Sequence, residues 1–475
     1  MKSTKILLAV IFSFLLTAPF TYSQDNEKNY SEAYTLIDKW LETQQAFDKL
    51  PGISAAVVKD QEILWSGAYG MANETDQTET STLCSICSIS KLFTAVAVMQ
   101  LYDQGKVRLD DTVEKFLPNY NVAQQFPASG PITVRSLLSH SSGLPREAAY
   151  PYWTGDFYFP TRQEIEGRFQ NQQTLYPAST YYQYSNLALS LLGEIVEEVS
   201  GMEYGAYVKQ NILDPLGLNN TYPELPKDQF GKQLAVGQTA IQSDGNRLVL
   251  PLFQAQGIAP AAGYASNVLD LAKFAQWQFR LRDTTITEIL KPATLKLMQQ
   301  VHFTDPGWNV TRGLGFGVWK GPNGTTWVGH GGSCPGYRST LQLDLKNKFA
   351  YTAMINASGT NPGKYTRGIY QILTKTEKPK EDAKDLSDYV GSYSNNPWWY
   401  ATYFGSWNGK LVSLSLPVDR PGDDMTFFKH IEGDVFRRVR DDGELGEELE
   451  FIRDVEGKVV TYKIHDNYYN RLKKY

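Results

Sequence analysis

The segment from Ser88 to Gln104 constrains the fold more than any other, because it is apolar on nearly all sides. A surface helix has one apolar face, whereas a helix that is apolar all round is buried. Gly105 follows the segment and is a typical helix stop. The sequence therefore predicts a domain built around a central buried helix.

Elements that could surround this helix occur on both sides of it in the chain. Helical patterns cover residues 31–50 and 187–200. Strand-like runs cover residues 53–58, 62–65, 325–328, 339–345 and 349–355. Strands at both ends with helices between them predict an α/β domain whose sheet joins the two ends.

The pattern changes after residue 375. Residues 376–386 are rich in charge and are typical of a linker. Residues 387–475 alternate short strands with turn dipeptides such as Asn408-Gly409 and Glu456-Gly457. We expect the α/β domain over residues 24–375 and a small antiparallel β domain over 387–475.

The first residues have the pattern of a secretory signal. Lys2 and Lys5 precede an apolar run, Ile6 to Leu16, and small residues lie just before Gln24. The run is shorter than the roughly 20 residues that a membrane-spanning helix needs. We expect a signal peptide over residues 1–23 and an exported protein, periplasmic or secreted, without a membrane span after cleavage.

Composition argues against two kinds of ligand, nucleic acid and a metal ion. The formal net charge of −5 gives no basic footprint for nucleic acid, so no nucleic-acid partner is expected. The five histidines and three cysteines do not have the spacing of a zinc motif. The sequence therefore predicts neither a metal site nor another cofactor.

Ser88-Ile89-Ser90-Lys91 could carry nucleophilic chemistry. Residues three apart share a helix face, so the Ser88 hydroxyl and the Lys91 amine can meet. Lysine can deprotonate a serine when burial lowers its pKa, and the apolar helix supplies that burial. Free backbone N–H groups at the helix start can stabilise an oxyanion. A chance tetrapeptide is the alternative for this motif alone.

Two further motifs are weak alone. In Tyr184-Ser185-Asn186, residues i and i+2 point the same way in extended chain, and tyrosine can relay a proton. His330-Gly331-Gly332-Ser333 follows a strand-like run, and its glycines permit close approach of a ligand. The alternatives are one more tyrosine in a tyrosine-rich stretch and a glycine-rich turn.

The order of these three motifs resembles that of the penicillin-binding-protein-like serine hydrolases, which include class C β-lactamases, DD-peptidases, D-aminopeptidases and esterases. Flanking residues 132–145 and 258–266 are similar to that family too, and the resemblance covers about residues 30–375. Residues 387–475 resemble the lipocalin-like barrel appended to many such hydrolases. The resemblance implies a β-lactamase/transpeptidase-like α/β fold, an antiparallel sheet flanked by helices with a helical lobe, followed by a small antiparallel β-barrel-like domain.

The resemblance also assigns roles to residues. It makes Ser88 the acylated nucleophile, Lys91 its general base and Tyr184 the proton shuttle. The residues it implies for substrate binding are Asn186, His330, Gly332 and Ser333. The backbone N–H groups of Ser88 and Ser333 would form the oxyanion hole.

One departure bears on substrate choice. His330-Gly331-Gly332 stands where many members have Lys-Thr-Gly, and histidine is mostly neutral at pH 7. This favours ester, amide or peptide substrates, D-amino-acid peptides among them, over strong recognition of a penicillin carboxylate. We therefore expect an exported serine hydrolase acting on a small-molecule or peptide substrate, with cell-wall material among the candidates. The alternatives are a β-lactamase or DD-carboxypeptidase proper, and a catalytically silent peptidoglycan- or peptide-binding protein.

The cysteines have three interpretations. In a subset of class A β-lactamases, a disulfide joins the positions that correspond to Cys87 and Cys334, and an oxidising compartment favours the same bond here. This pairing would leave Cys84 free. Three buried thiols, or a Cys84–Cys87 redox pair, are the alternatives.

Three other features stay secondary. His140 is expected to be a satisfied buried histidine rather than a catalytic base. The aromatic residues between 150 and 159 could wall the cleft or form a small core under a loop. Arg338 is a candidate for the cation missing at position 330.

Overall fold

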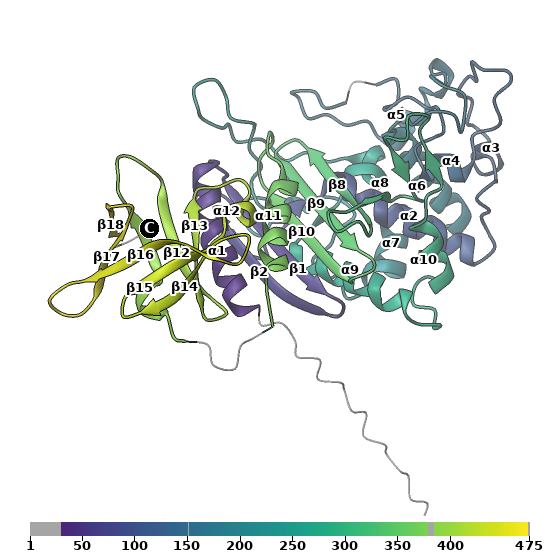
Figure 1. Cartoon of the computed structure of the whole chain (residues 1–475). Helices are drawn as coiled ribbons and strands as arrows, with labels where there is room; N and C mark the ends of the chain where they lie inside the picture. Colours follow the sequence, from purple (N-terminus) through teal and green to yellow (C-terminus); the bar gives the residue numbers. More distant parts are fainter. Residues whose placement is uncertain (1–29, 151, 379–383, 474–475) are drawn as a thin grey trace, which may run out of the picture.

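The computed structural model describes residues 30–150, 152–378 and 384–473. The predicted signal peptide and part of the predicted linker lie outside these residues. The rest divides into a sheet with helices on both faces, a helical lobe, and a barrel at the opposite end (Figure 1).

The main sheet is antiparallel and has the strand order β2-β1-β10-β9-β8-β7-β6-β5. Its strands are β1 (Gly52–Lys59), β2 (Glu62–Gly70), β5 (Phe303–Thr304), β6 (Thr311–Arg312), β7 (Gly317–Lys320), β8 (Thr326–Cys334), β9 (Tyr337–Asp344) and β10 (Phe349–Ile355). Ile53 pairs with Ile355, so the early strands join the late ones in one sheet. This confirms the fold class expected from the sequence.

Helices cover both faces of this sheet. The helices are α1 (Ser31–Phe47), α2 (Ser90–Asp103), α3 (Val113–Phe116), α4 (Val134–Leu138), α5 (Arg162–Glu166), α6 (Asn186–Ser200), α7 (Tyr204–Val208), α8 (Ala259–Ala262), α9 (Val268–Arg282), α10 (Pro292–Met298), α11 (Pro362–Thr374) and α12 (Pro421–Asp424). Helices α1 and α11 pack together on one face, and α9 packs against β1 and β10 on the other (Figure 1). Two short strands, β3 (Cys84–Ser85) and β4 (Ala265–Ser266), form a separate pair.

Helix α2 is the predicted central helix. Its residues from Ser90 to Leu101 are all buried, and it contacts α6 and α8 in the helical lobe. It begins two residues later than expected, because Cys87–Ile89 form a 3-10 turn first. Ser88 therefore lies in this turn, just before the helix that carries Lys91.

The last domain is a closed antiparallel barrel. Its strands are β11 (Gly391–Ser394), β12 (Ala401–Trp407), β13 (Lys410–Leu416), β14 (Thr426–Glu432), β15 (Val435–Val439), β16 (Leu445–Arg453), β17 (Val459–Ile464) and β18 (Asn467–Arg471). Aromatic side chains such as Tyr393, Phe404 and Phe451 fill its interior. The barrel packs on α1, where Trp40 Nε1 donates to Val418 O at 2.8 Å.

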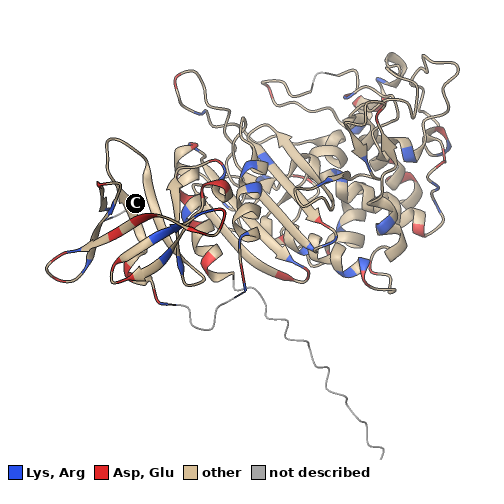
Figure 2. Ribbon diagram, viewed as in Figure 1, with Lys and Arg blue, Asp and Glu red and all other residues tan. Residues whose placement is uncertain are grey.

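Positions of charged residues of both signs are interspersed along the ribbon of the two domains in Figure 2. None of the helices within the described ranges is both long and apolar enough to cross a membrane.

Candidate active site

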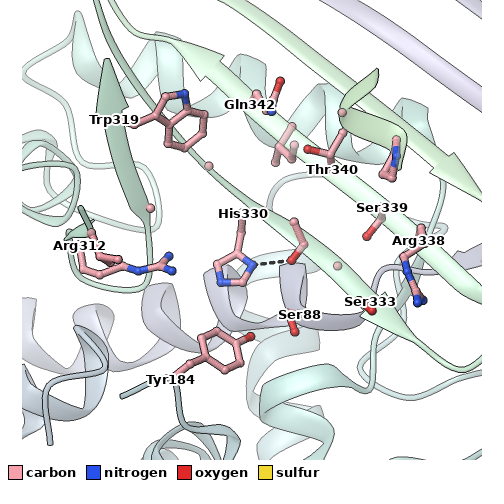
Figure 3. A pocket seen from close by; sticks show the side chains of 18 of the residues that line it. Ser88, Tyr184, Arg312, Trp319, His330, Ser333, Arg338, Ser339, Thr340 and Gln342 are labelled. Carbon is pink, nitrogen blue, oxygen red and sulfur yellow. Dashed lines mark hydrogen bonds between the residues drawn. The ribbon is translucent and has the colours of Figure 1, made fainter. Parts of the chain in front are cut away.

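A cavity of about 850 Å³ lies between the sheet and the helical lobe. Its lining brings Ser88 together with Tyr184 from the segment before α6 and with His330 and Ser333 from β8 (Figure 3). Lys91 and Asn186 lie buried beside it. The three motifs, far apart in the chain, therefore meet at one place.

Ser88 and Lys91 are in direct contact. Lys91 Nζ lies 3.3 Å from Ser88 Oγ, and Lys91 has no exposed surface. Burial lowers the pKa of Lys91 well below its usual value, partly offset by Glu147 and reinforced by Arg146 and Arg312. A neutral amine is a base, so this pair has the geometry that serine activation requires.

Two acceptors fix the orientation of the lysine amine. Lys91 Nζ donates to Asn186 Oδ1 at 2.8 Å and to Ala261 O at 2.7 Å. A neutral amine has two N–H donors and one lone pair. With both donors engaged, the lone pair of Lys91 is left to face Ser88 Oγ.

Tyr184 reaches the same serine from the other side of the lysine. Its hydroxyl points toward Ser88 in Figure 3; burial raises the pKa of Tyr184 to about 12, and the nearby Ser88 hydroxyl partly opposes this rise. Lys91 Nζ lies 4.8 Å from the centre of the Tyr184 ring, and the His140 ring packs on it at 4.4 Å. A protonated tyrosine beside both the serine and the lysine can pass a proton in either direction.

His140 supports this tyrosine from within the core. Its Nδ1 accepts from Ser185 N at 3.2 Å, and burial lowers the pKa of His140 well below its usual value. It is therefore a neutral, hydrogen-bonded histidine.

Asn186 is held by a residue that the sequence reasoning missed. Asn186 Nδ2 donates to Glu147 Oε1 at 2.7 Å, and the Trp153 indole donates to the same oxygen at 2.9 Å. Burial raises the pKa of Glu147, and these two hydrogen bonds lower it. No pattern in the sequence distinguishes Glu147 from the many other carboxylates, so its role could be identified only from the fold. In the structure Asn186 orients Lys91, and the expected contact with a substrate stays a prediction.

The motif around His330 lies inside a strand rather than in a turn after one. β8 continues to Cys334, and Gly331 and Gly332 pair with Thr340 and Ser339 of β9. The difference arises because glycine has low strand propensity, which pairing with a neighbour overrides. His330 Nδ1 contacts Gly331 O at 2.6 Å, and burial lowers the pKa of His330 to about 3.

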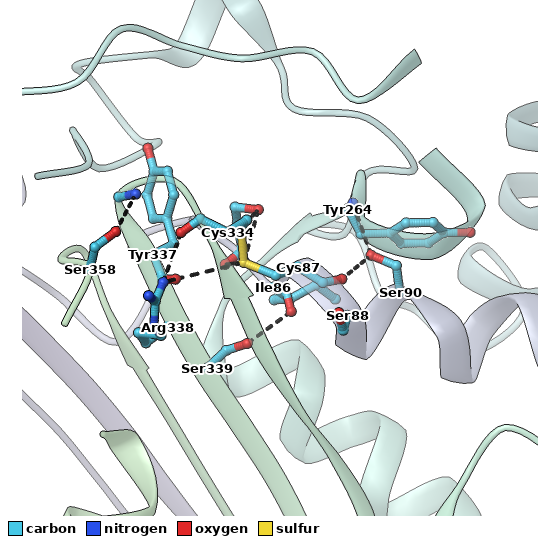
Figure 4. Close-up of a disulfide and its surroundings, with 12 residues drawn as sticks. Ile86, Cys87, Ser88, Ser90, Tyr264, Cys334, Tyr337, Arg338, Ser339 and Ser358 are labelled. Carbon is cyan, nitrogen blue, oxygen red and sulfur yellow. Dashed lines mark hydrogen bonds between the residues drawn. A yellow bond between two sulfur atoms is a disulfide. The ribbon is translucent and has the colours of Figure 1, made fainter. Parts of the chain in front are cut away.

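Gly332 is required by contacts within the protein. A side chain there would collide with Ile86 O and Ser339 Oγ, and Ser339 donates to Ile86 O at 2.8 Å (Figure 4). The sheet therefore approaches the segment just before Ser88 closely. The pairing of β8 with β7 ends at Gly329, and within the described residues no other strand takes over that side of β8. Every second residue of β8 after Gly329 therefore has backbone N–H and C=O groups that face the cavity.

Arg312 supplies a permanent cation beside His330. It lies in β6, lines the cavity, and its guanidinium points toward His330 in Figure 3. Its Nη2 donates to Tyr182 Oη at 2.5 Å, while its buried Nε has no hydrogen-bond partner within the described residues. Arg338, the candidate from the sequence, also lines the cavity, and its Nη1 donates to the backbone carbonyls of Cys334 and Tyr337.

A disulfide joins Cys87, next to the nucleophile, to Cys334 at the end of β8 (Figure 4). The two Cα atoms lie 5.7 Å apart, and the sequence separation is 247 residues. Cys84 is the free cysteine and is buried. The bond ties the turn that carries Ser88 to the strand that carries His330 and Ser333.

The aromatic segment near residue 155 belongs to the core rather than to the cavity lining. Tyr152 and Phe159 are buried in the main core, and Trp153 stacks edge-on against Phe159 at 5.0 Å. Among the described residues, no group of three or more His, Cys, Asp or Glu side chains is placed to hold a metal ion.

The chain matches the family model described as Beta-lactamase over residues 37–375. "Beta-lactamase-like protein 2" of Dictyostelium discoideum is 26% identical over 78% of this chain and 68% of its own length. A "Putative D-alanyl-D-alanine carboxypeptidase" of Escherichia coli is 25% identical over 60% of this chain and 72% of its own.

A solved structure shares the fold over most of the chain. The octameric penicillin-binding protein homologue from Pyrococcus abyssi has a TM-score of 0.64 and 25% identity, and the match covers 92% of this chain and 99% of that one. The similarity therefore extends beyond the main sheet and the helical lobe into the barrel.

Proposed function

Because the chain belongs to the β-lactamase family of serine hydrolases, we propose that it is an exported enzyme that hydrolyses an ester, amide or peptide through a Ser88 acyl-enzyme. The observation that carries the proposal is the contact between Lys91 Nζ and Ser88 Oγ, with both amine donors held elsewhere. Export rests on the signal-like pattern of residues 1–23.

Acylation follows from this geometry. Ser88 Oγ attacks the substrate carbonyl carbon while its proton passes to Lys91 Nζ, and the carbonyl oxygen becomes an oxyanion. Backbone N–H groups of Ser88 and Ser333 stabilise the negative charge. The bond to the leaving group then breaks, and the proton reaches the leaving group from Lys91 through the Tyr184 hydroxyl.

Deacylation reverses the proton path. Water attacks the acyl carbon and gives its proton to the Tyr184–Lys91 pair, and the ester bond to Ser88 breaks. Ser88 Oγ recovers a proton, and the acid product leaves. No step needs a metal or another cofactor.

A second candidate is a carboxypeptidase that recognises a terminal carboxylate. The Arg312 guanidinium in the cavity favours it, because arginine forms strong charge-assisted hydrogen bonds with carboxylates. The Escherichia coli relative whose name states a D-alanyl-D-alanine carboxypeptidase supports the same direction. Turnover of D-alanyl-D-alanine peptides against p-nitrophenyl esters and nitrocefin separates the candidates.

The nucleophile is tested by covalent labelling. The purified chain is treated with a fluorophosphonate and its intact mass measured, alongside the Ser88→Ala and Ser81→Ala variants. Ser81 bonds Glu79 away from the cavity and serves as the matched control. One adduct in the parent and the control, and none in Ser88→Ala, supports the proposal; equal labelling of all three contradicts it. Absence of any adduct supports the silent binding protein.

A further inference from the structure

A second cavity, of about 380 Å³, lies along helix α6, beyond the turn that carries Asn186. Its walls come from α5, α6, α7, α8 and the 3-10 turn Gln256–Ile258, and none of its lining residues lines the cavity at Ser88. Cavities of roughly 300–1,000 Å³ hold small organic ligands. The size of this one therefore fits a small molecule.

Two buried polar side chains of α6 line this cavity without a hydrogen-bond partner among residues 30–150, 152–378 and 384–473. Ser190 is 2% exposed, and its Oγ has no partner. Glu194, one helical turn later, is 6% exposed, and burial and neighbouring charges, not hydrogen bonds from the described residues, set the pKa of its carboxyl group. Buried polar groups are nearly always hydrogen-bonded. Two neighbouring side chains that both lack such a partner on one face of a helix therefore point to a ligand.

The other carboxylates at this cavity already have partners. Glu197 accepts from Tyr204 N at 2.8 Å and pairs with Arg162. Glu203 caps helix α7 by accepting from Gly205 N and Ala206 N. Glu194 is therefore the one carboxyl group of the lining that is left for a ligand.

The charges around Glu194 are mostly negative. Helix α5 supplies Arg162 and Glu166, α6 supplies Glu197 and Glu198, and the turn before α7 supplies Glu203. The segment from Ala255 to Ala262 has no charged residue. Burial raises the pKa of Glu194 to about 8; Glu166 and Glu198 add to this rise, and Arg162 partly opposes it. A cation in the cavity would offset this unfavourable environment.

The lining also has an apolar part, besides the polar residues Thr161 and Gln256. Gly193, Ala259, Pro260 and the Tyr204 ring enclose the space beside the two polar groups. A bare metal ion would find too few ligands here, since no cluster of three metal-ligating side chains occurs within the described residues. The lining fits a positively charged group that carries an apolar chain.

We propose that this cavity is a second binding site, which takes a small organic ammonium ion. The ammonium group donates to the Glu194 carboxylate and to Ser190 Oγ, and the apolar chain lies against Pro260 and Tyr204. The site adjoins the elements that hold the catalytic lysine: Asn186 lies one turn before Ser190, and Pro260 is next to Ala261 in α8.

The test uses n-butylammonium as the probe and n-butanol as its uncharged match. Calorimetry is done on the full chain after Ser88 has been blocked with a fluorophosphonate, so the catalytic cavity is occupied. We expect saturable binding of the ammonium ion and at least tenfold weaker binding of the alcohol. Equal binding of the two, or no binding of either, would overturn the proposal without bearing on the hydrolase activity.

Variants locate the site. Glu194→Gln, which keeps the side-chain shape, should weaken n-butylammonium binding at least tenfold. Glu198→Gln removes the same charge from an exposed position on the same helix and should change it less than threefold. Equal loss in both variants would show general electrostatic attraction and contradict a site at Glu194.

Proton release gives a readout that does not depend on the variants' stability. Glu194 is mostly protonated at pH 7, so binding of a cation must expel close to one proton, and at pH 9 close to none. Calorimetry in two buffers with different ionisation heats measures this number. Absence of proton release at pH 7 would contradict an ion pair with Glu194.

Discussion

Asn186 connects Lys91 to Glu147: its Oδ1 accepts from the lysine amine at 2.8 Å and its Nδ2 donates to the carboxylate at 2.7 Å. An amide oxygen and an amide nitrogen lie on opposite sides of the group, so the Glu147 contact fixes which atom faces Lys91. The proposed base thus depends on a residue that has no hydrogen bond to the serine.

The first prediction concerns Glu147 as a positioning residue. Glu147→Ala removes the acceptor for Asn186 and should slow acylation about tenfold or more, since a hydrogen bond to a charged group contributes roughly 1.5–3 kcal/mol. Glu147→Gln keeps an acceptor oxygen and should restore most of the rate. The rate of fluorophosphonate labelling measures both variants. A Gln variant as slow as the Ala variant would contradict the positioning role.

The second prediction concerns pH. Acylation needs neutral Lys91, whose pKa is lowered well below 10.5, so the labelling rate should rise with pH and level off well below pH 10.5. The pKa of His330 is about 3 and that of Tyr184 about 12, so neither residue should change the labelling rate between pH 6 and pH 8. Lys91→Met should lower the rate about 10²–10⁴-fold. A limb near pH 6.5 that disappears in His330→Ala would contradict this assignment.

The third prediction concerns Arg312. For a peptide with a free terminal carboxylate and its matched terminal amide, Arg312→Ala should lower kcat/KM about tenfold or more for the carboxylate alone. Arg338→Ala should leave the ratio of the two unchanged, because Arg338 is engaged by backbone carbonyls. An equal loss for both substrates in Arg312→Ala would assign Arg312 a structural role and remove the support for a carboxypeptidase.

The fourth prediction concerns the disulfide. Replacing Cys87 and Cys334 together by serine should lower the free energy of unfolding by about 2–5 kcal/mol, because the bond closes a long loop of 247 residues. Cys84→Ser tests whether loss of a thiol alone has this effect. Denaturant unfolding with and without reductant measures the difference. A reductant effect that persists in the double variant would point to another bond.

The sequence could predict what depends on local pattern and on motif order. The α/β class, the central helix and a C-terminal antiparallel β domain followed from periodicity and turn residues. The resemblance indicated the barrel form of that domain, Ser88, Lys91, Tyr184 and the cysteine pair. Glu147 and Arg312 could not be found in this way. Each reaches the site through the fold: Glu147 from the loop between α4 and α5, and Arg312 from a two-residue strand. The start of α2 and the extent of β8 were missed because local propensity does not include long-range pairing.

The pairing of Ile53 with Ile355 has a consequence for how the chain folds during its synthesis. β1 is among the first strands to be synthesised, yet one of its two neighbours, β10, emerges only after most of the chain. Contacts between residues so far apart form late and slowly. Until then β1 and β2 are an unfinished hairpin with an open, apolar edge, which invites aggregation. The growing chain must be protected during this interval, and the catalytic pocket is among the last features to be completed.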